Sequence, residues 1–282
     1  MDFPIIDMRV RPPFKSFIDC HLYENVHKES VLGRQRKMRW TPSPSSLDRS
    51  IDTFIQEMDD AGITKCVVPV RKATNGKNED VVNLVSNYPN RFIGVIDVHP
   101  RDGAKAIDDI EHYVVEGNCT GITMELGCRH VKDKMLINEP SVYPIYEYCE
   151  AMHIPLILMY GGGSSWKYYP MDALEQVCSD FPDLTIISSH GGWPRVREMC
   201  HLATNFPNLY ISTDFYLVNY FGANDYVIAA NNILQDQILF GTAYPIISFQ
   251  DAIEGYLCSG LRPDVLSKVM YKNAVRALGI EI

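Results

Sequence analysis

Short apolar runs rich in β-branched residues alternate along this chain with longer stretches of helical period. The apolar runs occupy residues 4–9, 65–70, 92–98, 121–126, 154–159, 184–189, 209–213 and 238–240. Each run is short and continuous, which is typical of buried strands. The pattern therefore predicts about eight strands.

Helical patterns lie between and after these runs, with apolar residues three and four positions apart. The clearest occupy residues 45–62, 102–117, 139–153, 170–182, 193–207, 248–260 and 262–279. Ser46 is a candidate N-cap for the first of them, and Gly62 marks its end.

The alternation of strands and helices continues through residues 1–282 with no break in composition. It predicts one α/β domain, a (β/α)8 TIM barrel. An open doubly wound sheet is the competing layout, but it needs a glycine-rich turn after the first strand, and residues 5–14 contain no glycine.

Residues 12–45 form a long loop between the first strand and its helix, and loops of this length are often lids.

The first strand, in the stretch IIDMRVRPPF, carries charges at every second position: Asp7, Arg9 and Arg11. Side chains alternate across a strand, so these three are expected to share one face. Active sites of TIM barrels lie at the C-terminal ends of the strands, so Arg9 and Arg11 are predicted to point into the mouth of the barrel. The alternative is a buried ion pair between Asp7 and one of the arginines.

Polar residues also follow most of the other apolar runs. They are Arg71, His99, Glu125, Tyr160, His190, Asp214, Thr242 and Tyr244. By the same rule they are candidates for a site at the mouth. A structural role in the core or in a turn is the alternative for each.

Charge and cysteine content narrow the function classes. A net charge of -9 disfavours nucleic acid as a partner, because a phosphate backbone requires a basic face. The single basic run, residues 34–39, is either a solvated loop or part of a lid that attracts an anion. The eight cysteines are scattered without a C-x-x-C pair, and the sequence has no signal peptide, so we expect a cytoplasmic protein. It has no long apolar segment, so we do not expect it to bind membranes.

Several segments together resemble the amidohydrolase-related family, which includes aminocarboxymuconate-semialdehyde decarboxylases and dicarboxylate lactonases. The segments HGGWPRV, at residues 190–196, and LFGTAYP, at residues 239–245, are the most specific, and weaker ones such as YPNRFIGVIDVHP extend the resemblance over nearly the whole chain. The resemblance implies a TIM barrel that acts on a small carboxylated substrate. Members of the family are often homodimers.

Members of that family usually hold one divalent metal. Its ligands correspond here to Arg9, Arg11, Met159 (or Tyr160, if the alignment shifts by one) and Ala243. A guanidinium is always protonated and only donates hydrogen bonds, so it cannot coordinate a cation. The usual metal site is therefore not expected, and no cofactor is predicted. The alternative is a relocated divalent metal, with ligands drawn from Asp7, His99, Glu125, His190 and Asp214.

The remaining polar residues suggest a reaction without metal. His190 matches the histidine that follows the sixth strand in the family, and with an unperturbed pKa of about 6.5 it is the candidate general base, with Asp7 or Asp214 orienting its ring. Arg9 and Arg11 are expected to hold a carboxylate or an oxyanion in place of the metal. Further substrate-binding candidates are Arg71, His99, Glu125, Tyr160, Trp193 and Tyr244.

The sequence thus favours a metal-independent hydrolase that cleaves a lactone-type C–O bond in a small anionic substrate. A lyase of the same family, either a decarboxylase or a hydratase, is one alternative. A catalytically silent barrel that binds an acidic metabolite is the other.

Overall fold

The computed structural model describes residues 3–20, 22–23 and 25–282, without the side chains of residues 25–29. Residues 1, 2, 21 and 24, which belong to the predicted domain and lid, lie outside the described residues.

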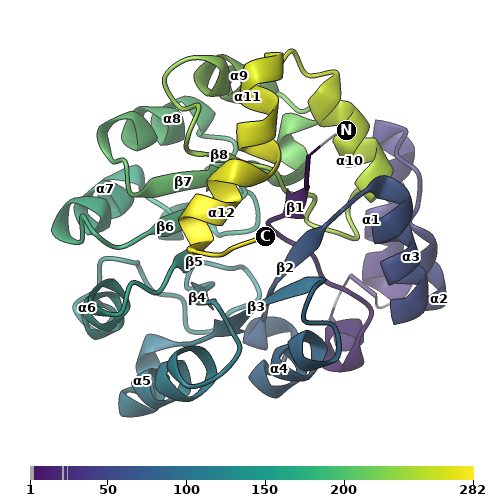
Figure 1. Ribbon diagram of the computed structural model, residues 1–282. Helices are drawn as coiled ribbons and strands as arrows, with labels where there is room; N and C mark the ends of the chain where they lie inside the picture. The colour runs from purple at the N-terminus through teal and green to yellow at the C-terminus, as the bar shows by residue number, and fades with distance from the viewer. Residues whose placement is uncertain (1–2, 21, 24) are drawn as a thin grey trace.

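Eight parallel strands follow one another in chain order around a barrel, with the helices outside (Figure 1). They are β1 (Ile6–Asp7), β2 (Lys65–Pro69), β3 (Phe92–Asp97), β4 (Gly121–Met124), β5 (Leu156–Met159), β6 (Ile186–Ser189), β7 (Leu209–Ser212) and β8 (Ile238–Leu239). The N–H of Met8 donates to the carbonyl of Phe240 over 3.0 Å, which joins the end of β8 to β1. The predicted TIM barrel and all eight strands are confirmed, although the strands are slightly shorter than predicted.

Apolar side chains fill the interior of the barrel. Inward-facing residues such as Val67, Ile157 and Ile187 form one buried cluster with Ala274 and Leu278. These last two belong to α12 (Asn273–Leu278), which crosses the end of the barrel where both termini lie (Figure 1). The outward-facing residues of the strands pack under the surrounding helices in a larger cluster. One end of the barrel is therefore closed, and a site can form only at the end where the strands stop.

The surrounding helices agree broadly with the predicted patterns. They are α3 (Ile51–Ala61), α4 (Asn78–Asn87), α5 (Ala104–Ile110), α6 (Tyr143–Ala151), α7 (Met171–Asp180), α8 (Val196–Asn205), α9 (Ala223–Asn231), α10 (Phe249–Leu257) and α11 (Pro263–Ser267). π-helical turns extend two of the patterns: η4 (Glu111–Val115) follows α5, and η7 (Lys268–Lys272) joins α11 to α12. No helix in the described part of the chain has the length and apolar character that a membrane span requires.

Among the helices that surround the barrel, α4 and α9 were not predicted, and neither was α1 (Asn25–Met38), which lies in the predicted lid and is described below. In α9 the apolar residues do not form a single stripe, because Ile228 is exposed while Tyr226 and Val227 are buried. In α4 only one face is apolar, with Val81, Leu84 and Val85 buried, and the helix is short. Weak or short periodicity is the physical reason why sequence patterns miss such helices.

The first predicted helix, residues 45–62, is divided in two. α2 (Pro44–Asp48) ends at Arg49, whose φ of 60° lies in the left-handed region. α3 then begins after Ser50, whose side chain accepts a hydrogen bond from the N–H of Thr53 over 3.2 Å. The N-cap is therefore Ser50, and the prediction of Ser46 was wrong. Ser46 instead donates to the carbonyl of Ser43.

Ser50→Ala is expected to lower the free energy of unfolding by about 1 kcal/mol, because α3 loses the acceptor for one of its first N–H groups. Ser50→Asp keeps an acceptor at the same place and is the matched control. Urea denaturation of both variants measures the difference. Equal destabilisation by Ala and Asp would show that capping is not the reason.

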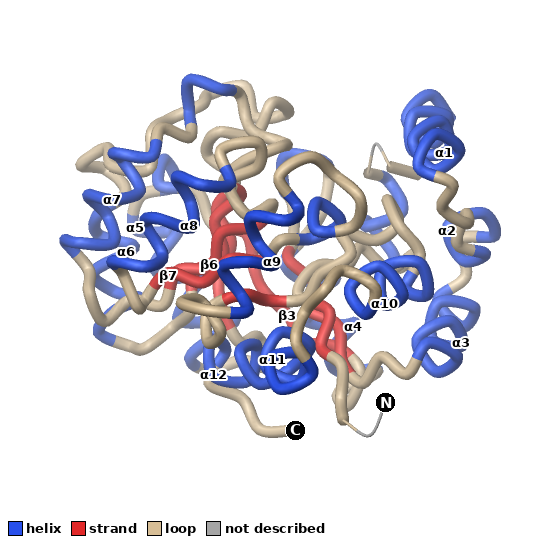
Figure 2. The backbone as a smooth tube through the Cα atoms, turned by 90° about the horizontal axis from the view of Figure 1, so that it is seen from above, coloured by secondary structure: helices blue, strands red, loops and turns tan. Residues whose placement is uncertain are grey.

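The predicted lid, residues 12–45, contains more regular structure than a loop. It holds the 3₁₀ turn η1 (Lys15–Asp19) and α1 (Asn25–Met38) before α2 begins. Figure 2 shows α1 at the end of the molecule opposite the two termini, which is the end where the strands stop. Val31 and Arg34 of α1 line the cavity described next. The segment thus lies beside the cavity, and it contains a helix where the sequence predicted a loop; that it acts as a lid stays a prediction.

Candidate active site

A cavity of about 270 Å³ lies at the C-terminal ends of the strands, bounded on one side by α1. Its charged and aromatic lining residues are Arg11, Arg34, Arg71, Arg129, His130, His190, Phe215 and Tyr216. Among the described residues, no aspartate or glutamate lines it. In a protein with a net charge of -9, this cavity is a local concentration of positive charge that suits an anionic ligand.

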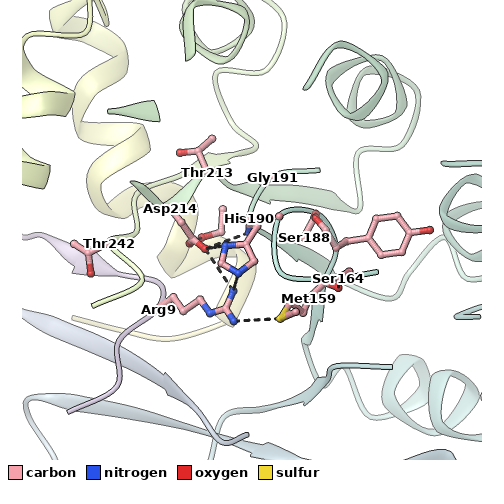
Figure 3. A network of polar contacts seen from close by, with 12 residues as sticks. Arg9, Met159, Ser164, Ser188, His190, Gly191, Thr213, Asp214 and Thr242 are labelled. Atoms are coloured by element: carbon pink, nitrogen blue, oxygen red, sulfur yellow. Dashed lines mark hydrogen bonds and ion pairs between the residues drawn. The ribbon is translucent and has the colours of Figure 1, made fainter. Parts of the chain in front are cut away.

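Arg9 lies beneath this cavity and is only 2% exposed. Its Nη1 atom is 2.8 Å from Nε2 of His190 and 3.5 Å from Oδ2 of Asp214, and Figure 3 shows both of these residues beside Arg9. Its Nη2 atom is 3.4 Å from Oε1 of Glu125. The Sδ atom of Met159 lies 3.6 Å from Nη2. Arg9 therefore forms ion pairs inside the protein and, contrary to the prediction, does not point into the mouth. A buried ion pair was the alternative, but its partners are Glu125 and Asp214 and not Asp7.

His190 and Asp214 form a close pair beside Arg9 (Figure 3). Nδ1 of His190 lies 2.7 Å from Oδ2 of Asp214. Burial, together with the charge of Arg9, lowers the pKa of His190 to about 4 despite this carboxylate. The imidazole is thus neutral at pH 7. The carboxylate at Nδ1 favours the tautomer with its proton on that nitrogen, which leaves the lone pair of Nε2 to face Arg9.

Asp214 is held firmly behind the histidine. Its Oδ1 accepts from Ser212 Oγ over 2.9 Å, and its Oδ2 accepts from the N–H of His190 over 3.2 Å. Burial alone would raise the pKa of Asp214, but His190, Arg9 and Ser212 lower it below its usual value. A side chain at Gly241 would place its Cβ 2.9 Å from Oδ1, so the close approach of β8 requires this glycine. Asp214 is therefore an ionised, immobile partner of His190.

Arg71 and Glu125 form a second buried ion pair. Nε of Arg71 lies 2.6 Å from Oε1 and 2.8 Å from Oε2 of Glu125. Burial alone would raise the pKa of Glu125, but Arg71 and Arg9 lower it. Burial and the Glu125 charge raise the pKa of nearby Asp97 to about 8, so Asp97 is mostly neutral at pH 7 and does not balance another cation.

Arg11 is the cation without a partner. It is 5% exposed, its Nε atom has no hydrogen-bond partner, and no carboxylate among the described residues pairs with it. Burial and the charges of Arg9 and Arg71 lower the pKa of Arg11 to about 9, so it is still protonated at pH 7. Three buried arginines thus face two ionised carboxylates, Glu125 and Asp214. The unbalanced charge belongs to Arg11 at the surface of the cavity.

Asp7 does not share a face with the two arginines, because β1 ends at Asp7 and the chain bends at Met8. Its Oδ1 accepts from the N–H groups of Arg9 (2.9 Å) and Thr242 (3.1 Å), and its Oδ2 accepts from the hydroxyl of Thr242 over 2.6 Å. Burial raises the pKa of Asp7 to about 7. Asp7 and Thr242 therefore fasten β1 to the segment after β8, and the expected orientation of His190 by Asp7 was wrong.

Four other candidates lie away from the cavity. Met159 faces the barrel interior, so alternation turns Tyr160 outward, where its hydroxyl contacts the Pro170 carbonyl. Tyr244 contacts Ser45 and Glu57 under α3, outside the mouth. Trp193 stacks behind Tyr216, with ring centres 4.6 Å apart. His99 caps η3 (Pro100–Asp102) and lines a neighbouring hollow with Asp97 and Glu125.

The structure also adds residues to the cavity lining, of which only Arg34 was anticipated, as part of the basic run in the predicted lid. Arg34 comes from the lid, Arg129 from the loop after β4, and Phe215 and Tyr216 from the 3₁₀ turn η6 (Asp214–Leu217). Arg34 belongs to the basic run at residues 34–39, which was the one available signal. Arg129, Phe215 and Tyr216 lie in irregular segments, where neither period nor strand ends mark them.

The metal implied by the resemblance does not fit these residues. Arg9 and Arg11 offer only donors, Ala243 has no donor atom for a metal, and Met159 provides only a thioether. The Nη1 atom of Arg9, 2.8 Å from Nε2 of His190, also occupies the lone pair that a metal would need. The described residues contain no group of three or more histidine, cysteine, aspartate or glutamate side chains that could hold a metal ion.

Comparison with known proteins agrees with the resemblance noted in the sequence. The family model described as amidohydrolase matches residues 18–280. A crystal structure of an uncharacterised TIM-barrel protein from Bordetella bronchiseptica is similar to this chain with a TM-score of 0.90 and 33% identity, over 98% of this chain and 99% of that chain.

Two more distant structures share the fold. One is 2,6-dihydroxybenzoate decarboxylase from Rhizobium, with a TM-score of 0.69 and 14% identity over 98% of both chains. The other is 5-carboxyvanillate decarboxylase from Novosphingobium aromaticivorans, complexed with manganese, with a TM-score of 0.67 and 14% identity over 99% of this chain and 97% of that chain. With the family model covering nearly its whole length, the chain belongs to the amidohydrolase family.

Proposed function

We propose that this protein is an enzyme that hydrolyses a lactone-type C–O bond in a small carboxylated substrate, without a metal ion. The observation that carries the proposal is the arrangement of His190 and Arg11. A neutral histidine, whose Nδ1 lies 2.7 Å from an ionised aspartate, lines a cavity that also contains a buried arginine without a carboxylate partner among the described residues. This combination supplies a general base and a binding group for an anion.

Arg11 binds the substrate carboxylate in this proposal. Its guanidinium is desolvated and has no carboxylate partner among the described residues, so an incoming carboxylate meets no competitor. Arg71, which lines the same cavity, is already bonded to both oxygens of Glu125 through Nε. It can still present its other nitrogens to a carbonyl oxygen, where charge develops during attack.

His190 acts on the attacking water. Nε2 takes one proton from the water as its oxygen attacks the carbonyl carbon, and the electron pair of the C=O bond moves to the oxygen, which the arginines stabilise. The intermediate then collapses, the ring C–O bond breaks, and the leaving alkoxide takes the proton from His190. The product is a hydroxy acid, and the histidine returns to its neutral form.

Arg9 controls when the base is free. Its Nη1 contact occupies Nε2 of His190 at 2.8 Å, while its contact to Glu125 is longer, at 3.4 Å. Base catalysis requires Arg9 to turn from Nε2 towards Glu125. Because Arg9 does not touch the cavity, it is a positioning residue and not a catalytic one.

The charge of the cavity favours hydrolysis over decarboxylation, the reaction named for the two distant relatives. Decarboxylation turns a carboxylate into neutral CO2, so cations that bind the carboxylate stabilise the ground state and raise the barrier. Ester hydrolysis creates a new oxyanion and then a new carboxylate. A cavity lined by four arginines, with no acid among the described lining residues, stabilises both.

The test is a screen of small lactones that carry a carboxylate, run in ¹⁸O-labelled water, with proton release and mass spectrometry as readouts. We expect at least one lactone to open with a single ¹⁸O in the product. Release of CO2 from carboxylic acids, with no lactone opened, would establish lyase chemistry instead. Carboxylate binding without any turnover would establish a silent barrel.

The same screen tests independence from metal. Protein purified without chelator is analysed for metal content and assayed before and after dialysis against EDTA. We expect the two rates to agree within experimental error. A stoichiometric divalent metal whose removal abolishes activity would refute the arginine-based mechanism.

A further inference from the structure

Tyr216 lines the cavity beside His190 but has no role in the reaction described above. It belongs to η6 and is 5% exposed. Its ring stacks on Trp193, with ring centres 4.6 Å apart and planes at 16°. The centre of the same ring lies 5.5 Å from that of His190, with the two planes nearly perpendicular at 87°. These contacts fix the plane of the ring, so the hydroxyl at its end has a defined position.

The Tyr216 hydroxyl is a hydrogen-bond donor without a partner in the described part of the chain. The hydroxyls of other buried tyrosines, such as Tyr23, Tyr146 and Tyr226, donate to backbone carbonyls over distances of 2.7, 2.9 and 2.9 Å. A buried tyrosine hydroxyl usually has such a partner. Burial raises the pKa of Tyr216 above its usual value, so the hydroxyl keeps its proton at pH 7. It is therefore a neutral donor that is available to a ligand.

Two glycines of the loop after β5 show where this hydroxyl lies. A side chain at Gly162 would coincide with the Tyr216 hydroxyl, and a Cβ at Gly163 would lie 3.4 Å from Nε2 of His190. Both glycines line the cavity. The Cα atoms of consecutive residues are only about 3.8 Å apart. The hydroxyl and Nε2 therefore border the same part of the cavity, and they can act on neighbouring atoms of one substrate.

We propose that the Tyr216 hydroxyl donates a hydrogen bond to the ring oxygen of the lactone, the atom that leaves when the C–O bond breaks. The inference rests on the proposed function, in which Arg11 and Arg71 bind the carboxylate and the carbonyl oxygen. In that mechanism the ring oxygen has no donor until His190 returns its proton. Tyr216 makes this oxygen a better leaving group, and it is a catalytic residue because it contacts a reacting atom.

This contact leaves the proton balance of the reaction unchanged. As the ring C–O bond breaks, its electron pair moves to the ring oxygen, and the proton on Nε2 of His190 is transferred to that oxygen. Tyr216 keeps its own proton and stabilises the negative charge that develops on the oxygen before the transfer. Because the hydrogen bond strengthens as this charge develops, it should affect kcat more than KM.

The first experiment detects the donor without any turnover, by isothermal titration calorimetry. Tetrahydrofuran-2-carboxylate and tetrahydrofuran-3-carboxylate carry a ring oxygen, whereas cyclopentanecarboxylate and benzoate carry only the carboxylate. In the wild type we expect at least one tetrahydrofuran acid to bind about threefold or more tightly than cyclopentanecarboxylate, because one neutral hydrogen bond distinguishes them. Tyr216→Phe should remove this preference and leave binding of cyclopentanecarboxylate and benzoate within twofold.

The controls separate the hydroxyl from the ring and from the carboxylate site. Tyr216→Phe keeps the ring that stacks on Trp193, so it should unfold at the same urea concentration as the wild type. Tyr220→Phe removes a hydroxyl from a ring whose centre is 5.2 Å from that of Tyr216 and which borders a different hollow. This variant should keep the wild-type preference. Arg11→Met should abolish binding of all four acids.

The second experiment uses the lactone that the screen identifies. Tyr216→Phe should lower kcat about 10²-fold, because the developing charge loses a donor, and should change KM by less than about threefold. Tyr220→Phe should leave both constants unchanged.

The outcomes distinguish this inference from the proposed function. If the ring-oxygen preference is absent from the wild type or survives Tyr216→Phe, or if kcat of the variant stays within twofold, Tyr216 is not the donor, and an opened lactone leaves the proposed function standing. If no lactone opens but the preference is present and lost in Tyr216→Phe, the donor is right and the proposed reaction is wrong. If no carboxylate binds the wild type, both are wrong.

Discussion

Arg9→Met and Arg11→Met are expected to change the stability of the protein in opposite directions, although the residues are only two positions apart. Arg9 contacts His190, Glu125 and Asp214 inside the protein. Removing one partner of a buried ion pair leaves the others uncompensated, which costs about 3–5 kcal/mol. Arg9→Met should therefore unfold at a distinctly lower urea concentration than the wild type.

Arg11→Met should instead raise the free energy of unfolding, by about 1–3 kcal/mol. Arg11 is a buried cation with an unsatisfied Nε, and the charges of Arg9 and Arg71 oppose its protonated form. A methionine, which is shorter and uncharged, removes the repulsion and the unmet hydrogen bond. The same variant should lose binding of carboxylates, so stability and function are exchanged at this position.

Urea denaturation at pH 7 measures both variants. Arg9→Lys and Arg11→Lys serve as controls, because each keeps the charge while changing the hydrogen-bonding geometry. A destabilised Arg11→Met would show that Arg11 has an internal structural partner, and would remove the main support for an anion at this position.

His190→Asn is expected to lower kcat/KM about 10²–10⁴-fold on the lactone that the screen identifies, because the reaction loses its general base. Binding of benzoate should remain, since Arg11 is unchanged. Asp214→Asn should also reduce the rate, because an amide at this position does not favour the productive tautomer of His190. Turnover that survives both substitutions would exclude His190 as the base.

The pH dependence gives a second readout for the same residue. In the proposed mechanism the base is the neutral imidazole of His190, whose pKa is lowered to about 4, so wild-type kcat/KM should fall only as the pH decreases through about 4. Burial and the Arg9 charge cause this low value. Arg9→Met should therefore move the acidic limb to higher pH, and a limb that stays in place would mean that Arg9 does not act on His190.

The alternation of strands and helices was enough to predict the barrel, since the strands are short, mostly buried runs and their inward residues follow a two-residue period. It was also enough to place Arg11, Arg71 and His190 at the mouth, because strand ends define the site in this fold. The same rule failed for Arg9 and Tyr160. At Arg9 the chain bends just after β1, so the regular alternation stops there. Tyr160 still alternates with the inward-facing Met159, and it therefore points outward although it lies at a strand end.

The sequence did not settle the partners of the charged groups. Arg71 pairs with Glu125 although β3 lies between β2 and β4 in the sheet. Asp214, one of the two carboxylates considered for His190, lies beside it because β6 and β7 are neighbours. Arg34 and Arg129 come from segments without a regular pattern. Their position at the cavity depends on how the lid and the β4 loop pack over the barrel.

The sequence by itself determined the fold, the family and the loss of the usual metal ligands, because these depend on periodicity and on the identity of residues at known positions. The tertiary structure decided which arginine is neutralised and which is free. That difference arises from long-range contacts and burial: Arg9 meets His190, Glu125 and Asp214 under the cavity, whereas Arg11 reaches the cavity surface and pairs with no carboxylate in the described part of the chain.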